Sequence, residues 1–354
     1  MKRTHLYYLD LLRVFLTILV FYHHSAIAFG ASGGWYYVSA STTSGITQAL
    51  LSLSMAVDQS YFMSLFFFIS AFLMPVSYDR KGTKAFMLDR LNRLGIPLLV
   101  YTFLINPLLL YWLYDVRWVT GLGPMWFVFT LLLFELTYVV YRSCLWRIRI
   151  AWQSPTTGGI LLFILIMGLA AFGIRLYIPI GTDIYGLQLG YFPLYIGMYL
   201  LGIVAQRNHW LDGLSVRRAL LWFLLAVLAG IPLLMYFMYM YLNQIALFNG
   251  GWNMQALFYA LWDPIMCVGI SGFLLAYGKS RCHVPIPCIQ QMSADSYAFY
   301  FIHPVVVVGF TLLAQLLPFS PLVRLLFVVV IGIPCCFVLA RGVRWGFKIV
   351  RVKL

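Results

Sequence analysis

The sequence predicts an all-α, polytopic membrane protein with about ten transmembrane helices and both termini in the cytoplasm. Three observations lead to this prediction. Of the 354 residues, 63% are hydrophobic and only 10% are charged, whereas a soluble domain carries roughly 25% charged residues. Ten separate apolar segments are each close to the length of about 20 residues that crosses a bilayer. The basic residues gather in alternate connections between those segments. The composition excludes a soluble enzyme, a disordered chain and a fibrous protein.

The apolar segments follow one another with short connections, so we expect a single transmembrane domain over residues 1–354 and no soluble domain. The predicted spans are Tyr8–Phe29, Ala56–Val76, Gly95–Tyr114, Met125–Tyr141, Gly158–Tyr177, Gly190–Gln206, Ala219–Tyr241, Gly251–Tyr277, Ser296–Leu317 and Leu322–Val343. The first span follows Lys2 and Arg3 and resembles a signal peptide, but Asp10 and Arg13 interrupt it. We therefore interpret it as an uncleaved span, since a signal peptide has a shorter and uncharged apolar region.

The charge distribution sets the predicted orientation. Of 24 Lys and Arg residues, 20 fall at one set of alternate connections or at the termini, and the formal net charge is +14. Basic residues collect in cytoplasmic loops, so both termini are predicted to be cytoplasmic, and an even number of spans is required. The basic balance alone would also fit nucleic-acid binding, but the chain has no nucleic-acid-binding motif. The six cysteines lack paired metal-ligand spacing, and we expect neither a metal site nor a bound cofactor.

The longest connection, Gly30–Met55, contains the aromatic run Trp35-Tyr36-Tyr37 and is predicted to be extracytoplasmic. Two interpretations stay open for the aromatic residues. They form part of an interfacial aromatic belt, or they provide a platform on which sugar rings stack.

Ionisable groups inside lipid are expensive and usually mark function. In the first span, Arg13 and His24 are 11 residues apart, which places them on one face of a helix and about 16 Å apart along its axis. His23 lies 80° away from that face, and Asp10 is close enough to pair with Arg13. His24 is either a catalytic base or a structural hydrogen-bonding group, and Arg13 is either part of a buried ion pair or a guide for a substrate.

These residues also resemble the membrane acyltransferase type-3 family, in which an Arg or Lys is followed, after ten residues, by a His. Four further stretches agree with that family in order along the chain. They are Leu65–Leu73 with Ser70, Phe86–Pro97 with Arg90 and Arg93, Met125–Phe127, and Ser293–Pro304 with Tyr297, Tyr300 and His303. One position departs from the pattern, because Ala71 stands where the family usually has Gly, a residue that allows close helix contact.

The resemblance implies transfer of an acyl group from cytoplasmic acyl-CoA, as a co-substrate, to a hydroxyl of a carbohydrate or glycolipid in a bacterial inner membrane. It implies His24 as general base and Arg13 beside the donor path. The residues that it implies on the donor side are Arg90, Arg93, Ser70, Tyr297 and His303. The acyl group is expected to be acetyl or succinyl, and the oligomeric state stays open.

Depth along the predicted spans places the remaining ionisable groups. Glu135 and Asp263 are predicted to lie about 15 Å and 18 Å from the outer ends of their spans, near the midplane, with Arg13 as the expected counter-ion of one of them. His303 is predicted about 10 Å above the cytoplasmic end of span nine, on the donor side and away from His24. The acceptor-side and charge-pair candidates are thus Trp35, Glu135, Asp263 and Asp10.

A non-enzymatic transporter or flippase for a glycan or lipid is the competing interpretation. Transporters often contain internal repeats and broken helices, and no repeat is evident in this chain. Consumption of acyl-CoA separates the two, because an enzyme consumes it and a flippase does not.

Overall fold

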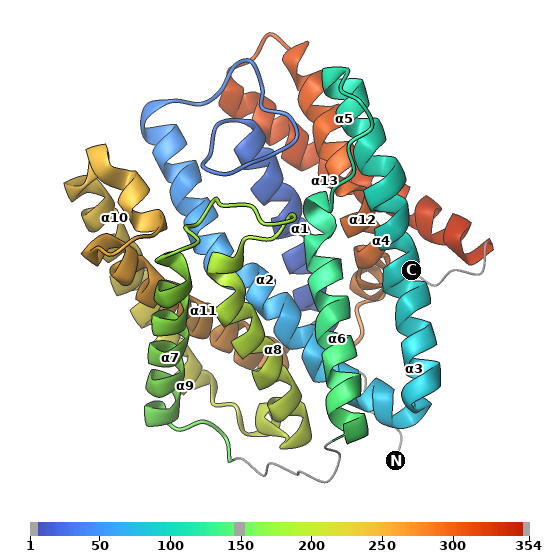
Figure 1. Ribbon diagram of the computed structural model, residues 1–354, viewed down its shortest axis with the longest axis vertical. Coiled ribbons are helices and arrows are strands. Elements are labelled where there is room, and N and C mark those ends of the chain that lie inside the picture. The colour runs from blue at the N-terminus through green and yellow to red at the C-terminus, as the bar shows by residue number, and fades with distance from the viewer. Residues whose placement is uncertain (1–5, 145–152, 350–354) are drawn as a thin grey trace. The chain divides into compact units, whose positions relative to one another are not determined.

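Helices make up most of the chain, and the computed structural model describes residues 6–144 and 153–349 (Figure 1). Ten helical stretches of the described part are long and apolar enough to cross a membrane, and no strand occurs in it. These findings confirm the predicted fold class and the count of ten. The cytoplasmic placement of both termini stays a prediction, as does the assignment of one domain to residues 1–354.

The chain forms two compact units. Of the described residues, the first unit contains 6–56, 81–144 and 284–349. Its helices are α1 (Tyr7–Ala28), α3 (Thr83–Arg90), α4 (Ile96–Val100), α5 (Asn106–Tyr114), α6 (Trp126–Cys144), α12 (Pro287–Gln315) and α13 (Pro321–Ile349). Within this unit α12 packs against both α1 and α13, and these three helices build its core.

Of the described residues, the second unit contains 57–80 and 153–283. Its helices are α7 (Thr157–Arg175), α8 (Phe192–Arg207), α9 (Val216–Leu224), α10 (Ile231–Met240) and α11 (Met254–Arg281). The long helix α2 (Gly45–Lys81) supplies its first turns to the first unit and the rest to the second. In the second unit α11 packs against α7 and α9.

Three π-helical turns interrupt the spans in the described part of the chain, and each comes directly before an Ile-Pro or Asn-Pro pair. They are η1 (Leu91–Gly95), η2 (Tyr101–Ile105) and η6 (Leu225–Gly230), followed by Pro97, Pro107 and Pro232. A proline lacks an N–H group and its ring clashes with the carbonyl of the fourth residue before it. A π turn relieves that clash by adding one residue to the turn, so Thr83–Tyr114 continues as one span through α3, η1, α4, η2 and α5.

Several helices begin earlier than their apolar segments. The third span begins at Thr83 instead of Gly95, so Arg90 and Arg93 lie in a helix and the prediction that they lie in a loop is wrong. The second begins at Gly45, which shortens the predicted connection 30–55 to residues 29–44. The ninth begins at Pro287, where proline suits the first helical position. The predicted boundaries followed the apolar residues, which contact lipid. The first turns of these helices are polar, so the apolar pattern did not include them.

Candidate functional site

His24 lies in a cluster of aromatic rings in the first unit. The indole of Trp35 stacks on its imidazole with ring centroids 3.9 Å apart and planes 18° apart. His303 of α12 lies 5.3 Å from His24, also at 18°. The ring of His23 stands edge-on to His24, at 5.5 Å and 88°. His24 itself is partly exposed, so an imidazole that can accept a proton is held among packed rings and remains accessible.

The position of His303 corrects the prediction that it lies apart from His24. The predicted span began at Ser296, whereas α12 begins at Pro287. His303 is 16 residues into α12, about 24 Å along its axis, and His24 is 17 residues into α1, about 26 Å along it. The two histidines are therefore at similar depths, and their rings meet. His303 is fully buried and its Nδ1 lies 2.6 Å from the carbonyl oxygen of Tyr300.

The loop of residues 29–44 holds Trp35 in place, since hydrogen bonds tie it into the first unit. The hydroxyl of Tyr36 donates to Oδ1 of Asn106 and lies 3.1 Å from the hydroxyl of Tyr101. Tyr114 donates to the backbone carbonyl of Tyr36 at 2.5 Å. Burial raises the pKa of Tyr36 to about 12, so its hydroxyl stays a donor throughout the neutral range. This anchoring explains why the neighbouring indole lies against His24.

Arg13 pairs with Asp10 on its own helix. The Nη1 of Arg13 is 3.6 Å from Oδ1 of Asp10, which also accepts a hydrogen bond of 2.8 Å from Ser293 in α12. The Arg13 side chain remains 35% exposed. The expectation that Arg13 neutralises Glu135 or Asp263 is wrong, because arginines closer in space pair with both carboxylates.

Glu135 of α6 pairs with Arg90, whose Nε lies 3.3 Å from Oε2 of the carboxylate. Arg93 is exposed and lies within electrostatic range of Arg13, Arg90 and Tyr297. The hydroxyl of Tyr297 is buried and has no hydrogen-bond partner among the described residues. The guanidinium groups of Arg13 and Arg93 are thus more accessible to a ligand than that of Arg90, which pairs with Glu135 and is 15% exposed.

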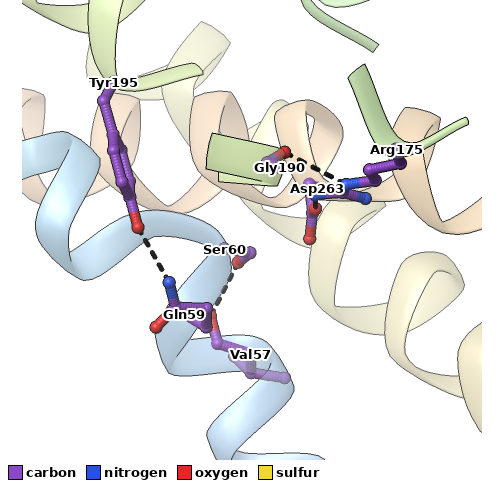
Figure 2. A network of polar contacts seen from close by, with 7 residues as sticks. All are labelled: Val57, Gln59, Ser60, Arg175, Gly190, Tyr195 and Asp263. Carbon is purple, nitrogen blue, oxygen red and sulfur yellow. Dashed lines mark hydrogen bonds and ion pairs between the residues drawn. The ribbon is translucent and has the colours of Figure 1, made fainter. Parts of the chain in front are cut away.

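The other two predicted site residues, Ser70 and Asp263, belong to the second unit. Ser70 lies in α2 and is partly buried. Asp263 of α11 forms a buried ion pair with Arg175 at the end of α7, with Nη2 and Oδ2 2.5 Å apart (Figure 2). The Nε of Arg175 donates to the carbonyl of Gly190 at 3.1 Å. The guanidinium also faces the ring of Tyr191, so this one side chain joins α7, α11 and the 3-10 turn Leu189–Tyr191 that precedes α8.

The same view shows a neighbouring contact in which Gln59 of α2 donates to the hydroxyl of Tyr195 in α8 at 2.8 Å (Figure 2). Both contacts join side chains of different helices within the second unit. The buried pair of Arg175 and Asp263 therefore has the geometry of a structural connection.

Two ion-paired sites of the described residues were not predicted from the sequence, that of Arg175 with Asp263 and that of Asp295 with Arg341 and Arg344, whose side chains are 52% and 19% exposed. Arg175 lies near the end of the predicted span Gly158–Tyr177, where an arginine is expected to reach the aqueous interface, yet its side chain is 1% exposed. Asp295 is fully buried and contacts Nε of Arg344 at 2.8 Å and Nε of Arg341 at 3.3 Å. The spacing of Arg341 and Arg344, on one face of a helix, was the available signal for the second pair. No group of three potential metal ligands gathers anywhere in residues 6–144 or 153–349.

Comparison with curated proteins and with solved structures gives no significant match to either. A family model described as an acyltransferase domain matches residues 6–341. This match runs from the start of α1 nearly to the end of α13 and includes His24, His303 and every other predicted site residue. The chain therefore belongs to the acyltransferase type-3 family and is a membrane acyltransferase.

Proposed function

We propose that the protein transfers an acetyl or succinyl group from cytoplasmic acyl-CoA to a hydroxyl group of a carbohydrate or glycolipid acceptor. The observation that supports this most is the partly exposed His24, held among Trp35 and His303 in a chain of the acyltransferase family. A neutral imidazole is the side chain best suited to take a proton from a hydroxyl near neutral pH.

In the proposed reaction, His24 takes the proton of the acceptor hydroxyl as its oxygen bonds to the thioester carbon. The carbon–sulfur bond then breaks, and the imidazolium returns the proton to the leaving thiolate of CoA. The proton lost by the alcohol is thus the proton gained by the thiol. No metal or redox partner is needed for this balance.

The donor side of the proposal rests on charge. CoA is polyanionic, and Arg13 and Arg93 offer the partly exposed guanidinium groups that phosphates prefer. Tyr297, with its unpartnered hydroxyl, is proposed to line the same path, and the donor-side role of Ser70 stays an expectation from the family motif. Basic residues mark the cytoplasmic face, so we place the donor there, in a bacterial inner membrane, with the acceptor at or across the bilayer.

Purified protein in proteoliposomes tests this function. Acetyl-CoA or succinyl-CoA is supplied with an envelope glycan extract, and release of free CoA thiol is followed together with the mass of the glycans. We expect thiol release coupled to acylated glycan. A protein that leaves acyl-CoA intact yet moves glycan or lipid between leaflets would instead be a transporter or flippase.

Two variants assign the base. His24→Ala should abolish transfer and leave the protein folded, while the matched variant His23→Ala should retain a substantial part of the activity. Loss in His23→Ala with retention in His24→Ala would contradict the assignment of His24.

A further inference from the structure

The geometry of α12 fixes where His303 holds its proton. A carbonyl oxygen only accepts hydrogen bonds, so Nδ1 of His303, 2.6 Å from the carbonyl oxygen of Tyr300, must donate. In the neutral ring this leaves a lone pair on Nε2. That atom is buried and has no hydrogen-bond partner among the described residues. A buried acceptor without a donor is costly, so a donor is to be expected beside it in the working enzyme.

His24 has a ring nitrogen that can supply this donor. Its Nδ1 is also buried and lacks a partner in the described part of the chain. The separation of the two imidazoles is informative, because face-to-face stacking brings Trp35 and His24 to 3.9 Å. Two imidazoles joined edge to edge by a hydrogen bond of about 3 Å have centroids roughly 5 Å apart. The near-parallel rings of His24 and His303, with planes 18° apart, have a centroid separation of 5.3 Å, close to that value, although no direct hydrogen bond joins Nδ1 of His24 to Nε2 of His303 in the structure.

We propose that His303 is a positioning residue for His24, an inference that builds on the proposed function. Nε2 of His303 accepts the Nδ1 proton of His24, directly once substrates are bound or through one water. Catalytic hydrogen bonds are often long in unliganded enzymes and shorten on loading. Nε2 of His24 then keeps the lone pair that receives the proton of the acceptor hydroxyl.

The resulting order runs from the Tyr300 carbonyl to His303, then to His24, then to the acceptor hydroxyl. It reproduces the arrangement of nucleophile, base and orienting group that activated hydroxyls require. A single proton is transferred in the reaction, first from the acceptor hydroxyl to Nε2 of His24 and then from Nε2 to the thiolate. Tyr300 is held in turn, since its hydroxyl donates to the carbonyl of Pro124 at the start of the fourth span.

The simpler account is that His303 only fills space between α12 and α1. Two substitutions separate the accounts. His303→Phe keeps a ring of similar shape and removes the acceptor atom, whereas His303→Gln keeps an acceptor oxygen and loses the ring. A packing role predicts that the Phe variant works better, and a positioning role predicts that the Gln variant does.

The kinetic arm uses acetyl-CoA and the envelope glycan extract. His303→Phe should lower kcat by at least about 100-fold with the KM for acetyl-CoA nearly unchanged, and His303→Gln should recover part of the loss. Because residues acting as a unit are non-additive, the double variant His24→Ala/His303→Phe should be no slower than His24→Ala. Wild-type kcat in His303→Phe would overturn the inference, whereas failure of the wild type to use acetyl-CoA or succinyl-CoA would overturn the proposed function.

An arm that needs no turnover follows the tautomer of His24 by NMR of protein labelled with ¹⁵N-histidine, with the His24→Ala spectrum as assignment. We expect Nδ1 of His24 to bear the proton in the wild type and in His303→Gln, and Nε2 to bear it in His303→Phe. A wild-type spectrum with the proton of His24 on Nε2 would overturn the inference even if the enzyme is active.

Discussion

A buried charge is tolerated in this protein where a second side chain pairs with it. Arg175 and Asp263 form such a pair, and both side chains are 3% exposed or less. Removing one partner of such a pair leaves an uncompensated charge in low dielectric. We expect Arg175→Met to lower the free energy of unfolding by about 3–5 kcal/mol, measured by thermal or denaturant unfolding in detergent.

The matched control is Arg207→Met in the same unit. Arg207 pairs with Asp79 through Nη2 and Oδ1 at 3.1 Å, and the two side chains are 32% and 41% exposed. A solvated pair of this kind contributes about 0–1 kcal/mol. Equal losses in the two variants would mean that Arg175 and Asp263 are not desolvated.

Arg13 offers a prediction about binding. Its replacement by Ala leaves Asp10 with the hydrogen bond from Ser293, so the carboxylate keeps a partner. We therefore expect Arg13→Ala to melt close to wild type without ligand and to lose most of the stabilisation that acetyl-CoA gives the wild type. That stabilisation is about 2.7 kcal/mol when the donor is present at 100 times its Kd.

Thermal melts with and without acetyl-CoA measure both quantities. A variant that melts far below wild type without the donor, yet keeps the full shift with it, would assign Arg13 to the scaffold.

For individual residues, the sequence predicts contacts within one helix better than contacts between helices. The pairing of Arg13 with Asp10 follows from a separation of three residues. The meeting of His24 with His303 does not, since it depends on where α12 begins and on how it packs against α1. The pairing of Asp263 with Arg175 could not be predicted either, because an arginine near the end of a span is expected to reach the membrane interface.

Among the elements, the contact of α2 with α8 shows how a small residue lets two helices approach. A Cβ atom on Gly202 would lie 2.5 Å from the carbonyl oxygen of Phe68 and 2.8 Å from Cβ of Ala71. Ala71 stands where the family pattern has Gly, and Gly202 supplies the missing space from the facing helix. We expect Gly202→Ala to cost about 1–3 kcal/mol by overpacking, measured as a lower Tm in detergent.

The control for this prediction is Gly272→Ala in α11, where an added Cβ meets no atom within 4 Å. Alanine is favoured over glycine in a helix by about 1 kcal/mol, so this variant should be unchanged or more stable. A Gly202→Ala protein as stable as Gly272→Ala would contradict close packing at this contact.

The ten spans were predictable because lipid demands long apolar helices. Their polar first turns were not, since residues such as Arg90 and Arg93 read as a loop by composition and yet continue a helix. The π turns before Pro97, Pro107 and Pro232 also escaped, because a proline predicts a disturbance of the helix without specifying its form.

For the whole molecule, the asymmetric distribution of charge makes a prediction about sidedness. With 20 of 24 basic residues at one set of ends, the loop 29–44 should face outward and Lys84 inward. In a background without native cysteines, Ser41→Cys should react with an impermeant maleimide in intact cells, and Lys84→Cys only after permeabilisation. Both parent residues are exposed. The reverse pattern would invert the topology and move the proposed donor side.

The indole of Trp35 has a consequence for fidelity. Any acyltransferase with an accessible base risks using water as its acceptor and wasting the donor. Here the indole covers one face of the His24 ring. Water can therefore reach the imidazole from fewer directions, while a sugar hydroxyl held in place can still reach its exposed part. Trp35→Ala should therefore raise acetyl-CoA hydrolysis relative to productive transfer, measured as thiol released per acetylated glycan. An unchanged ratio would mean that exclusion of water depends on groups other than the indole.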